Sequence, residues 1–344
     1  ILRPLPEPVE SEAGTLATPN GVPWNVALTQ ADRVWSELHV DGSGILVGIS
    51  DSGVEGGHPE IKDAAASNGL NWLDPWYGSP EPTDISGHGT AVTSIILGKN
   101  TGIAPGAEWM GCVNLARNLG NPAYYVECMQ FLLAPYPQGG DAFTEGEPAL
   151  GAQVVNYSWS CPIVEGCDPD ALLPAAAALR AAGIFQAAAV GNMGTGYCGT
   201  AGDPPAIYSQ VFSVGSINSD ENMSDFSSEG PVLVDGSLRI KPDLLAPGEA
   251  VIAANAVSSY ESVSGTSFAS PHVAGVVALM WSANPGLIGE VELTENLLRQ
   301  SANAYTGPTA DCSNIQNYDS SGIRYGILNA YETVRLALAA GGNP

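Results

Sequence analysis

Residues 44–50 read GILVGIS, an apolar run of strand length that leads directly into Asp51. Three similar runs follow at 153–157, 184–190 and 211–217. None of these runs alternates polar with apolar residues, so each is expected to be buried on both faces, as strands are in a parallel sheet.

Helical segments lie between and after these runs. Residues 171–182 are rich in Ala and Leu and end at Gly183, a residue type that favours the C-terminus of a helix. Residues 267–281 and 291–300 are two further predicted helices, and a helix is also expected to begin at Thr29, where TQAD resembles a capping box with Asp in place of Glu. Strands that alternate with helices predict an α/β fold with a mostly parallel sheet, in which active sites gather at the carboxyl ends of strands.

The composition indicates a globular protein with a strong negative charge. Of 344 residues, 44% are hydrophobic, which is enough for a sizeable core. Eleven Lys and Arg against 36 Asp and Glu give a formal net charge of −25. Such a charge repels nucleic-acid phosphate and anionic membranes, so we expect neither as a partner. It should attract cationic stretches of a substrate, although a solvated acidic surface with no role in specificity is the alternative.

The N-terminal residues and the cysteines indicate how the chain is divided and in which compartment it folds. Residues 1–21 are rich in Pro, Glu, Gly and Thr and are interpreted as an extension or arm, with residues 22–344 as the main domain. The first residues lack the basic start and apolar core of a signal peptide, and no apolar run is long enough to span a membrane. Six cysteines, an even number, fit disulfides formed in an oxidising compartment.

The pairing of these cysteines stays open at this point. Cys112 with Cys128 closes the shortest plausible loop apart from Cys161 with Cys167. Cys198 flanks a neighbouring segment, so it could exchange partners with either of the latter two.

Three short segments at the edges of predicted elements carry the residue types of nucleophilic catalysis. SDSG at 50–53 follows the first strand, GHGT at 87–90 opens an apolar stretch, and GTSFASP at 265–271 opens a predicted helix. A serine hydroxyl is a poor nucleophile until a base takes its proton, and histidine is the natural base near neutral pH. A buried carboxylate fixes the imidazole tautomer and stabilises the imidazolium. The segments therefore supply a candidate catalytic triad, which consists of Asp51, His88 and Ser267.

Together these segments resemble the signature motifs of the subtilisin-like serine proteases, the subtilase family S8. The chain order Asp, His, Ser is the order found in subtilisin. The third motif continues as PHVAG at 271–275, which makes it specific by itself. AAVGN at 188–192 resembles the family segment that ends in the oxyanion-hole asparagine. The resemblance therefore implies that Asn192 and the backbone N–H of Ser267 donate to the developing oxyanion.

Further segments extend the resemblance over about residues 24–338. KPDLLAPG at 241–248 and YGILNA at 325–330 are similar to family segments. Residues 111–128, together with Ala134-Pro135, resemble the bacillopeptidase F-like branch. The resemblance implies a three-layer, doubly wound α/β sandwich with a central, mostly parallel sheet, and a prodomain that is cleaved from a precursor.

The resemblance also implies a substrate groove. NYSWS at 156–160 is similar to the strand that lines one side of the S1 pocket, and AVG at 189–191 would line the other side. RNLG at 117–120 resembles the edge that pairs with an extended substrate backbone. The implied substrate contacts are Gly120, Ser158, Trp159, Ser160, Val190 and Gly191.

Asp203 is a further candidate contact, because it lies where the family places the floor of the S1 pocket. An acidic floor would favour Lys or Arg at the P1 position of the substrate. The alternative is that Asp203 caps the turn before Pro204.

A structural metal is a separate question. Glu60 resembles a position that ligates calcium in the family, but LGKNTGIAP at 97–105 is short where many members carry a longer calcium-binding loop. That site is therefore expected to be lost, while calcium elsewhere stays open because carboxylates are abundant. The histidines outside the triad are interpreted as structural; they are His39, His58 and His272.

The sequence thus predicts a secreted, extracellular serine endopeptidase that acts as a monomer on protein or peptide substrates and needs no cofactor for its chemistry. The first alternative is a catalytically silent subtilase-fold protein that binds peptides without cutting them. The intact triad and Asn192 argue against it. The second alternative is a specialised processing protease with one physiological target.

Overall fold

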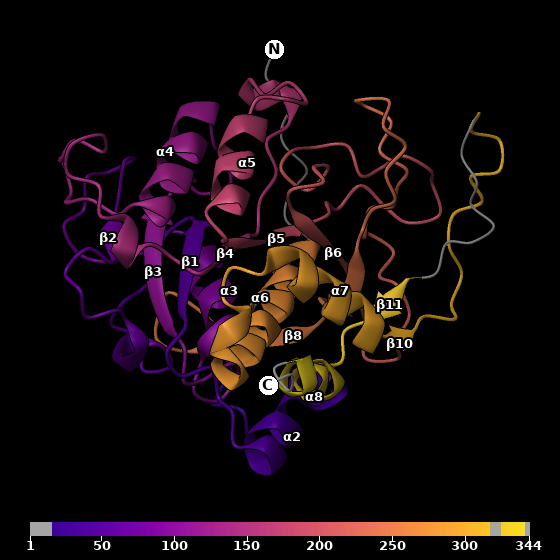
Figure 1. Ribbon diagram of the computed structural model, residues 1–344, viewed down its shortest axis with the longest axis horizontal. Coiled ribbons are helices and arrows are strands. Elements are labelled where there is room, and N and C mark those ends of the chain that lie inside the picture. Colours follow the sequence, from indigo (N-terminus) through magenta and orange to yellow (C-terminus); the bar gives the residue numbers. More distant parts are fainter. Residues whose placement is uncertain (1–15, 317–324, 341–344) are drawn as a thin grey trace.

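The computed structural model describes residues 16–316 and 325–340. Its centre is a nine-stranded sheet with the order β10-β11-β7-β6-β5-β4-β1-β3-β2 (Figure 1). Every neighbouring pair is parallel except β10 with β11, which confirms the predicted α/β fold with a mostly parallel sheet. The strands are β1 Leu46–Asp51, β2 Trp72–Leu73, β3 Glu108–Val113, β4 Val154–Tyr157, β5 Phe185–Ala189, β6 Phe212–Ile217, β7 Leu244–Pro247, β10 Asn303–Ala304 and β11 Gly326–Ile327.

Helices cover both faces of this sheet and make three layers. The apolar residues of α4 and α5 share one buried cluster on one face, and those of α3, α6, α7 and α8 share another on the opposite face (Figure 1). The longer helices are α3 His88–Leu97, α4 Pro122–Leu133, α5 Leu173–Ala181, α6 Thr266–Ala283, α7 Val291–Ser301 and α8 Ala330–Ala340. The chain order of the strands reverses at β1, which lies between β4 and β3. In doubly wound sheets such a reversal is where ligands bind.

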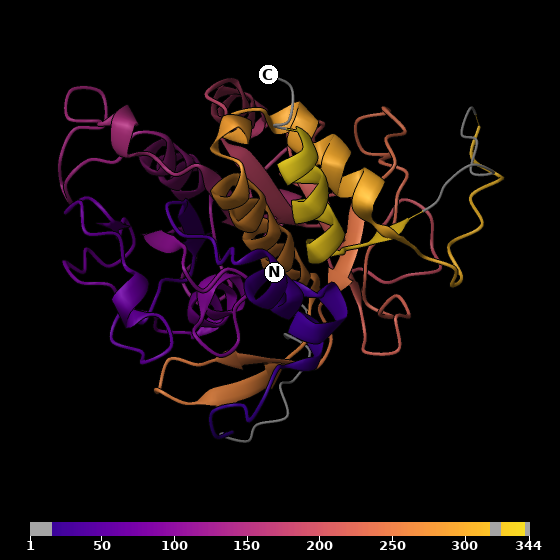
Figure 2. The same cartoon turned by 60° about the horizontal axis from the view of Figure 1, so that its bottom comes forward.

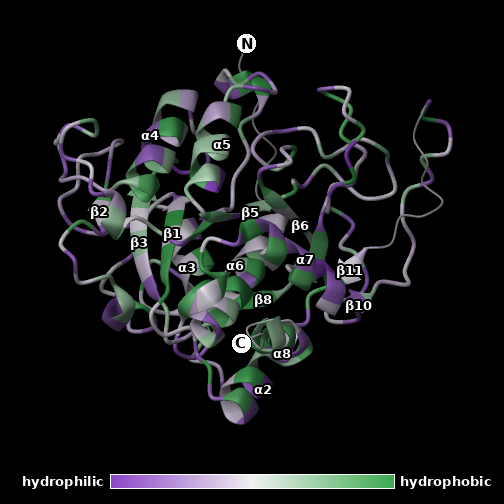
Figure 3. Ribbon diagram, viewed as in Figure 1, coloured by the Kyte–Doolittle hydropathy of each residue, from purple (hydrophilic) through white to green (hydrophobic). Residues whose placement is uncertain are grey.

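The strands do not alternate polar with apolar residues because helices cover both faces of the sheet. Along β1, Val47 and Ile49 lie in the cluster beneath α3 and α6. Gly48 faces the other way, where an added Cβ would lie 2.8 Å from a methyl carbon of Leu132 on α4. Both faces of the strand are therefore apolar, and Figure 3 shows hydrophobic colouring along the inner strands and α6.

A small antiparallel hairpin lies outside the main sheet. It consists of β8 Val251–Ala254 and β9 Tyr260–Val263, with Val251 opposite Val263. Figure 2 shows it extending along the lower edge of the molecule. Leu16 pairs with Tyr260 on this hairpin, so the described end of the predicted arm lies against β9.

The predicted helix start at Thr29 is wrong. Thr29 is the last residue of α1 (Trp24–Thr29), and its hydroxyl donates back to the carbonyls of Asn25 and Val26 instead of capping a new helix. Gln30 follows in the left-handed conformation with φ 62°, which separates α1 from α2 (Ala31–Arg33) and the π-helical turn at 34–38. A threonine that bonds to carbonyls three and four residues before it cannot serve as an N-cap.

The structure resolves the cysteine pairing. Cys112 pairs with Cys128 and Cys161 with Cys167, so of the pairings that the sequence left open the two shortest loops are the ones that close. Cys198 pairs with Cys312, across a sequence separation of 114 residues. Helices long and apolar enough for a membrane span do not occur within residues 16–316 and 325–340.

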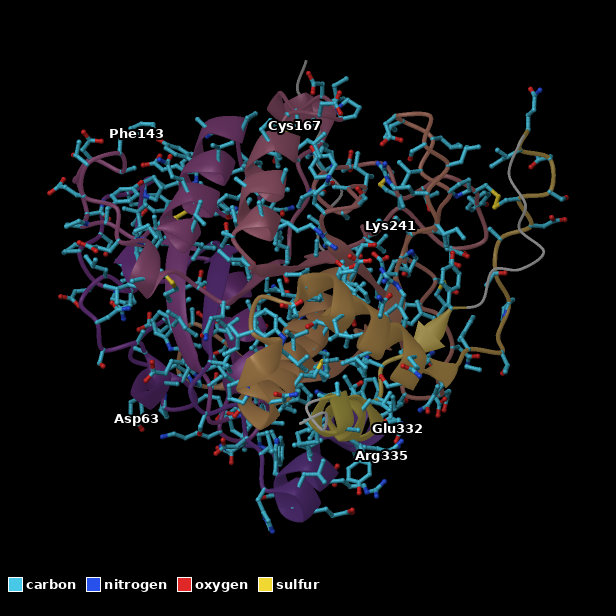
Figure 4. All side chains as sticks on the ribbon, viewed as in Figure 1. Asp63, Phe143, Cys167, Lys241, Glu332 and Arg335 are labelled. Atoms are coloured by element: carbon cyan, nitrogen blue, oxygen red, sulfur yellow. A yellow bond between two sulfur atoms is a disulfide. The ribbon has the colours of Figure 1, made fainter. Side chains whose placement is uncertain are left out.

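A buried ion-pair cluster joins β6 to the region before β7. The ammonium of Lys241, which is 2% exposed, donates to the carbonyl of Val211 and to the carboxylate of Asp243. Arg299 on α7 approaches the other oxygen of Asp243 at 2.8 Å. Figure 4 shows Lys241 within the fold, whereas Asp63 lies at its outer edge.

Removing the Asp243 carboxylate should destabilise the fold strongly. Asp243→Ala leaves the Lys241 ammonium buried without its anion, and we expect the free energy of unfolding to fall by about 3–5 kcal/mol. Asp63→Ala is the matched control, because Asp63 pairs with Lys99 at an exposed site, where water screens the pair and its loss should change the free energy of unfolding far less. Chemical denaturation measures both values, and equal losses would contradict the prediction.

Candidate active site

The site is built around the carboxyl end of β1. Asp51 is the last residue of that strand, at the point where the strand order reverses, and it is 1% exposed. Its Oδ1 accepts hydrogen bonds from the backbone N–H of Ser52 at 2.7 Å and from Nδ1 of His88 at 2.7 Å. The structure therefore brings two of the three predicted triad residues into direct contact.

The Asp51–His88 contact sets the state of the imidazole. Because Nδ1 donates to the carboxylate, Nε2 is left as the nitrogen that can accept a proton. Burial by itself would lower the pKa of His88, but the charge and hydrogen bond of Asp51 and the charges of Asp84 and Glu261 outweigh burial and raise it. The site thus favours an imidazolium beside Asp51, which is the form a general base reaches after it takes a proton.

His88 is placed by the first turn of α3. The helix begins at His88, after Gly87 with φ 86°. A Cβ on Gly89 would lie 2.0 Å from the carbonyl oxygen of Gly53 and 3.0 Å from Cβ of Asp51. Glycine is therefore required for the helix to approach the end of β1 this closely.

Asp84 is a buried residue of the site that the sequence reasoning missed. Its Oδ1 accepts from the hydroxyl of Ser52 and from the backbone N–H groups of Ser86 and Gly87. Its Oδ2 accepts from the backbone N–H and the hydroxyl of Thr90. One carboxylate thus ties the loop after Asp51 to the N-terminus of α3, where a negative charge is also favoured by the helix dipole. The spacing D-x-x-G-H-G was visible in the sequence as a possible helix-start signal.

Ser267 lies in the first turn of α6, and the helix contains Pro271 four residues later. Proline has no N–H to donate to the carbonyl four residues before it, so the carbonyl of Ser267 is free of its usual helical partner. The hydroxyl of Ser158, just beyond β4, donates to this carbonyl instead. The proline of the motif therefore allows a side chain from the sheet to fix the backbone of Ser267.

A buried polar network extends this connection. Asn156 donates from Nδ2 to the hydroxyl of Ser158 at 2.8 Å and accepts at Oδ1 from the hydroxyl of Ser270 at 2.8 Å. All three side chains are buried and connect the end of β4 to the first turn of α6. A fully satisfied buried network of this kind holds its backbone in one position.

The hydroxyl of Ser267 donates to the carbonyl of Ser158 at 3.0 Å. Within the described ranges no hydrogen bond joins it to Nε2 of His88. The two segments are nevertheless adjacent, because the ring of Phe268 lies 5.2 Å from the ring of His88, centroid to centroid. Rotation of the Ser267 side chain is needed to form the serine–histidine contact, and such contacts are often long in an unliganded site.

Asn192 lies beside the same turn. Its Oδ1 accepts from the backbone N–H of Thr266 at 3.0 Å and from the hydroxyl of Thr266 at 2.9 Å. These bonds fix the amide orientation and leave Nδ2 as the donor, near Gly265, where an added Cβ would lie 3.6 Å from Nδ2. Asn192 and the first turn of α6 therefore present N–H donors to one small region.

The predicted groove residues differ in which of their side-chain or backbone groups a ligand could reach. The side chain of Trp159 is buried, donates to the carbonyl of Ser50 and stacks on Tyr125, so only its backbone is available to a ligand. Val190 is also buried, and Gly191 donates from its N–H to the hydroxyl of Thr266 at 3.2 Å.

Asp203 lies on a loop that contacts the segment after Ser160. The N–H of Cys161 donates to the carbonyl of Pro204 at 2.8 Å, which places Asp203 beside the predicted S1 wall. Asp203 is half-buried, and burial raises the pKa of its carboxyl. No described residue donates a hydrogen bond to it or pairs with it, and a turn-capping bond of the alternative kind is not among the contacts of the described residues.

Glu60 does not fit a calcium ligand in this fold. Its carboxylate accepts five hydrogen bonds, from the N–H and side-chain amide of Asn100, the N–H and hydroxyl of Thr101, and the hydroxyl of Tyr260. These donors occupy the lone pairs that a cation would need. In the described part of the chain, no group of three or more His, Cys, Asp or Glu side chains is arranged to hold a metal ion.

The interpretation of His58 and His272 as structural agrees with their surroundings. Burial lowers the pKa of His272 to about 4, so the ring is neutral; it bonds to the carbonyl of Phe268 and to Asn25. His58 bonds to the N–H of Glu60 and the carbonyl of Ser259.

Comparison with known proteins connects this geometry to a family. Residues 42–320 match the model of the subtilase family. The chain is 32% identical over 334 residues to bacillopeptidase F of Bacillus subtilis. This alignment covers 92% of the present chain but only 22% of the length of bacillopeptidase F. It is 30% identical over 271 residues to subtilisin DY of Bacillus licheniformis, covering 77% of this chain and 86% of the relative.

A solved structure shows the same fold. The crystal structure of a cold adapted subtilisin-like serine proteinase superposes with a TM-score of 0.62 at 25% identity, covering 85% of this chain and 90% of that one. The match of the family model over most of the chain, together with these relatives, shows that the protein belongs to the subtilase family of serine endopeptidases.

Proposed function

We propose that this chain is a secreted serine endopeptidase that hydrolyses peptide bonds of proteins through an acyl-enzyme on Ser267. The observation that carries the proposal is the Asp51–His88 hydrogen bond of 2.7 Å next to a serine at the N-terminus of a buried helix. Three disulfides support an extracellular location, since such bonds persist in oxidising compartments. We also propose residues 22–344 as the catalytic domain, acting as a monomer released from a prodomain.

In the first step, Nε2 of His88 takes the proton of the Ser267 hydroxyl as its oxygen attacks the scissile carbonyl. Asp51 stabilises the resulting imidazolium and keeps the ring oriented. His88 then gives the proton to the leaving amine, which departs and leaves the acyl-enzyme. A water molecule then adds its oxygen to the ester carbonyl while His88 takes one of its protons. The bond between the acyl carbon and the Ser267 oxygen breaks, His88 returns the proton to that oxygen, and the acid is released.

The negative charge on the carbonyl oxygen needs donors that already point at it. Nδ2 of Asn192 and the backbone N–H of Ser267 fill this role in the proposal, since the amide of Asn192 is held by Thr266 and the turn by Ser158. Donors that are fixed beforehand need no reorganisation as the charge develops.

A peptide-binding protein without catalysis remains the alternative function. It would keep the groove but would not require the Asp51–His88 contact or the fixed orientation of Asn192. Removing the nucleophile separates the two functions.

Ser267→Ala should abolish hydrolysis of a mixed peptide library while peptide binding remains. We expect kcat to fall by about 10⁶-fold, and Asn192→Ala to lower it by about 10²–10³-fold. Ser282→Ala, near the other end of α6, is the matched control and should leave hydrolysis unchanged. A serine-directed phosphonylating inhibitor should block the parent chain. Hydrolysis that persists in Ser267→Ala would contradict the assignment of Ser267 as the nucleophile of the triad.

Asp203 should direct cleavage after Lys or Arg. Its half-buried carboxylate lacks a described partner and lies beside the S1 wall, so a cationic P1 side chain would supply the missing charge. In Asp203→Asn, the ratio of kcat/KM for P1 Arg over P1 Leu should fall by at least about tenfold. Asp225→Asn removes an exposed carboxylate and is the charge-matched control. An unchanged ratio in Asp203→Asn would favour a purely structural role for this residue.

The pH profile should respond to Glu261. The charges of Asp51, Asp84 and Glu261 face His88 and raise its pKa, and activity requires neutral His88, so the rate rises as pH passes upward through that pKa. Glu261→Gln removes one negative charge, lowers the pKa of His88 and should shift the acid limb of kcat/KM to lower pH. Glu292→Gln, an exposed site on α7, should cause no shift. A shift toward higher pH in Glu261→Gln would contradict the electrostatic argument.

A further inference from the structure

Ser228 is hydrogen-bonded to the residues on both sides of Asn192. It lies in the connection between β6 and β7, and its side chain is fully buried. Its hydroxyl accepts the backbone N–H of Met193 at 3.0 Å, and its own backbone N–H donates to the carbonyl of Gly191 at 2.9 Å. One serine from a distant part of the sequence therefore contacts the backbone before and after Asn192.

These two bonds fix the direction in which the Asn192 side chain leaves the backbone. The carbonyl of Gly191 belongs to the peptide unit before the Cα of Asn192, and the N–H of Met193 belongs to the unit after it. Peptide units are planar, so the backbone at one residue changes only by rotation of these two units about its Cα. Because Ser228 bonds to both units, it restrains both rotations.

Thr266 restrains the other end of the same side chain. Its backbone N–H and hydroxyl hold Oδ1 of Asn192, and its hydroxyl also accepts the N–H of Gly191 at 3.2 Å. The contacts of Thr266 thus orient the amide, while those of Ser228 orient the backbone from which the amide extends. Nδ2 of Asn192 has a defined position only when both sets of contacts are made.

The local backbone is shaped for the contact with Ser228. Gly191 has φ 113°, which lies in the region that favours glycine, and an added Cβ would lie 3.0 Å from the hydroxyl oxygen of Ser228. Glycine at this position therefore permits both the turn of the chain and the approach of the hydroxyl.

Ser228 is itself held in place by the next residue, Glu229, which is 1% exposed. The backbone N–H of Glu229 donates to the hydroxyl of Thr200 at 2.8 Å. Its carboxylate accepts the backbone N–H groups of Gly196 at 3.0 Å and Ala310 at 3.2 Å. A buried polar network that bonds to several segments holds its backbone in one position, so Ser228 is a fixed support for Asn192.

We propose that Ser228 is a positioning residue that acts through Asn192, because its hydroxyl holds Nδ2 of Asn192 where negative charge develops on the scissile carbonyl. The inference rests on the proposed function, which assigns Nδ2 as an oxyanion donor. A donor that is aligned beforehand stabilises the transition state without reorganisation. Loss of the Ser228 hydroxyl should therefore lower kcat and leave KM close to that of the parent chain.

The first measurement compares two buried serines that are neighbours in the sequence. Ser228→Ala removes the hydroxyl and keeps the backbone bond to Gly191, and we expect kcat to fall by about two- to tenfold, the value of one net hydrogen bond. Ser227→Ala is the matched control, because Ser227 is equally buried and its hydroxyl accepts one backbone N–H, that of Ser216 on β6 at 3.1 Å. Ser227→Ala should keep the kcat of the parent chain.

A double-mutant cycle then tests whether Ser228 acts through Asn192. In the Asn192→Ala background the amide donor is absent, so the addition of Ser228→Ala should cause no further loss of kcat. The same loss in both backgrounds would show that Ser228 supports the site in a general way and would overturn the inference. Thermal unfolding of every variant establishes that each is folded.

The outcomes separate this inference from the proposed function. A folded Ser228→Ala with the kcat of the parent chain, beside a slowed Asn192→Ala, would overturn the role of Ser228 and leave the endopeptidase function standing. Equal losses of kcat in Ser227→Ala and Ser228→Ala would also overturn it, since the loss would then follow from the burial of a serine alone. A parent chain that hydrolyses no peptide would overturn both.

Discussion

The burial of α6 is the constraint on which the rest of the site depends. The helix packs against β4, β5, β6 and β7 and against α3 and α8, and all but a few of its residues are buried. A helix enclosed in this way cannot shift or rotate without disturbing the core on every side. Its first turn is fixed further by the hydroxyl of Ser158, which uses the carbonyl that Pro271 leaves unpaired. The position of Ser267 therefore depends on how α6 packs against the strands of the sheet and against α3 and α8.

The second theme is how a chain with a net charge of −25 buries carboxylates. The buried acids are stabilised mainly by N–H and O–H donors, because cations are scarce: Asp84 and Glu60 accept only from backbone amides, hydroxyls and an amide side chain. Two acids differ and pair with cations: Asp243 with Lys241 and Arg299, and Glu295 with Arg180 and Arg299. Satisfied in this way, a carboxylate can join two segments that approach each other from distant parts of the chain, as Asp84 does for the loop after Asp51 and α3.

The sequence predicted the parts of the fold that depend on local composition. The four apolar runs became β1, β4, β5 and β6 with ends shifted by only a few residues, and the helix predicted at 267–281 became α6. β3 (Glu108–Val113) was missed because EWMGCV lacks a continuous aliphatic run, and α4 because its aromatic residues favour strands, although Asn121 and Pro122 signal a helix start. The spacing D-x-x-G-H-G signalled a helix start at Asp84, but its bond to Ser52 was beyond sequence reasoning, since it depends on tertiary approach between residues 32 positions apart.

The Cys198–Cys312 disulfide has a consequence for the lifetime of such a molecule. A protease meets its own copies, and its irregular surface segments are the places where one copy can nick another. The bond encloses the residues from 198 to 312, a stretch that contains Asp203, β6, β7, the hairpin and Ser267. A single break anywhere inside that stretch leaves the two pieces covalently attached, with the core still holding both. Autolytic damage there would create a new pair of ends without releasing a fragment, so loss of a piece of the chain would require a second break.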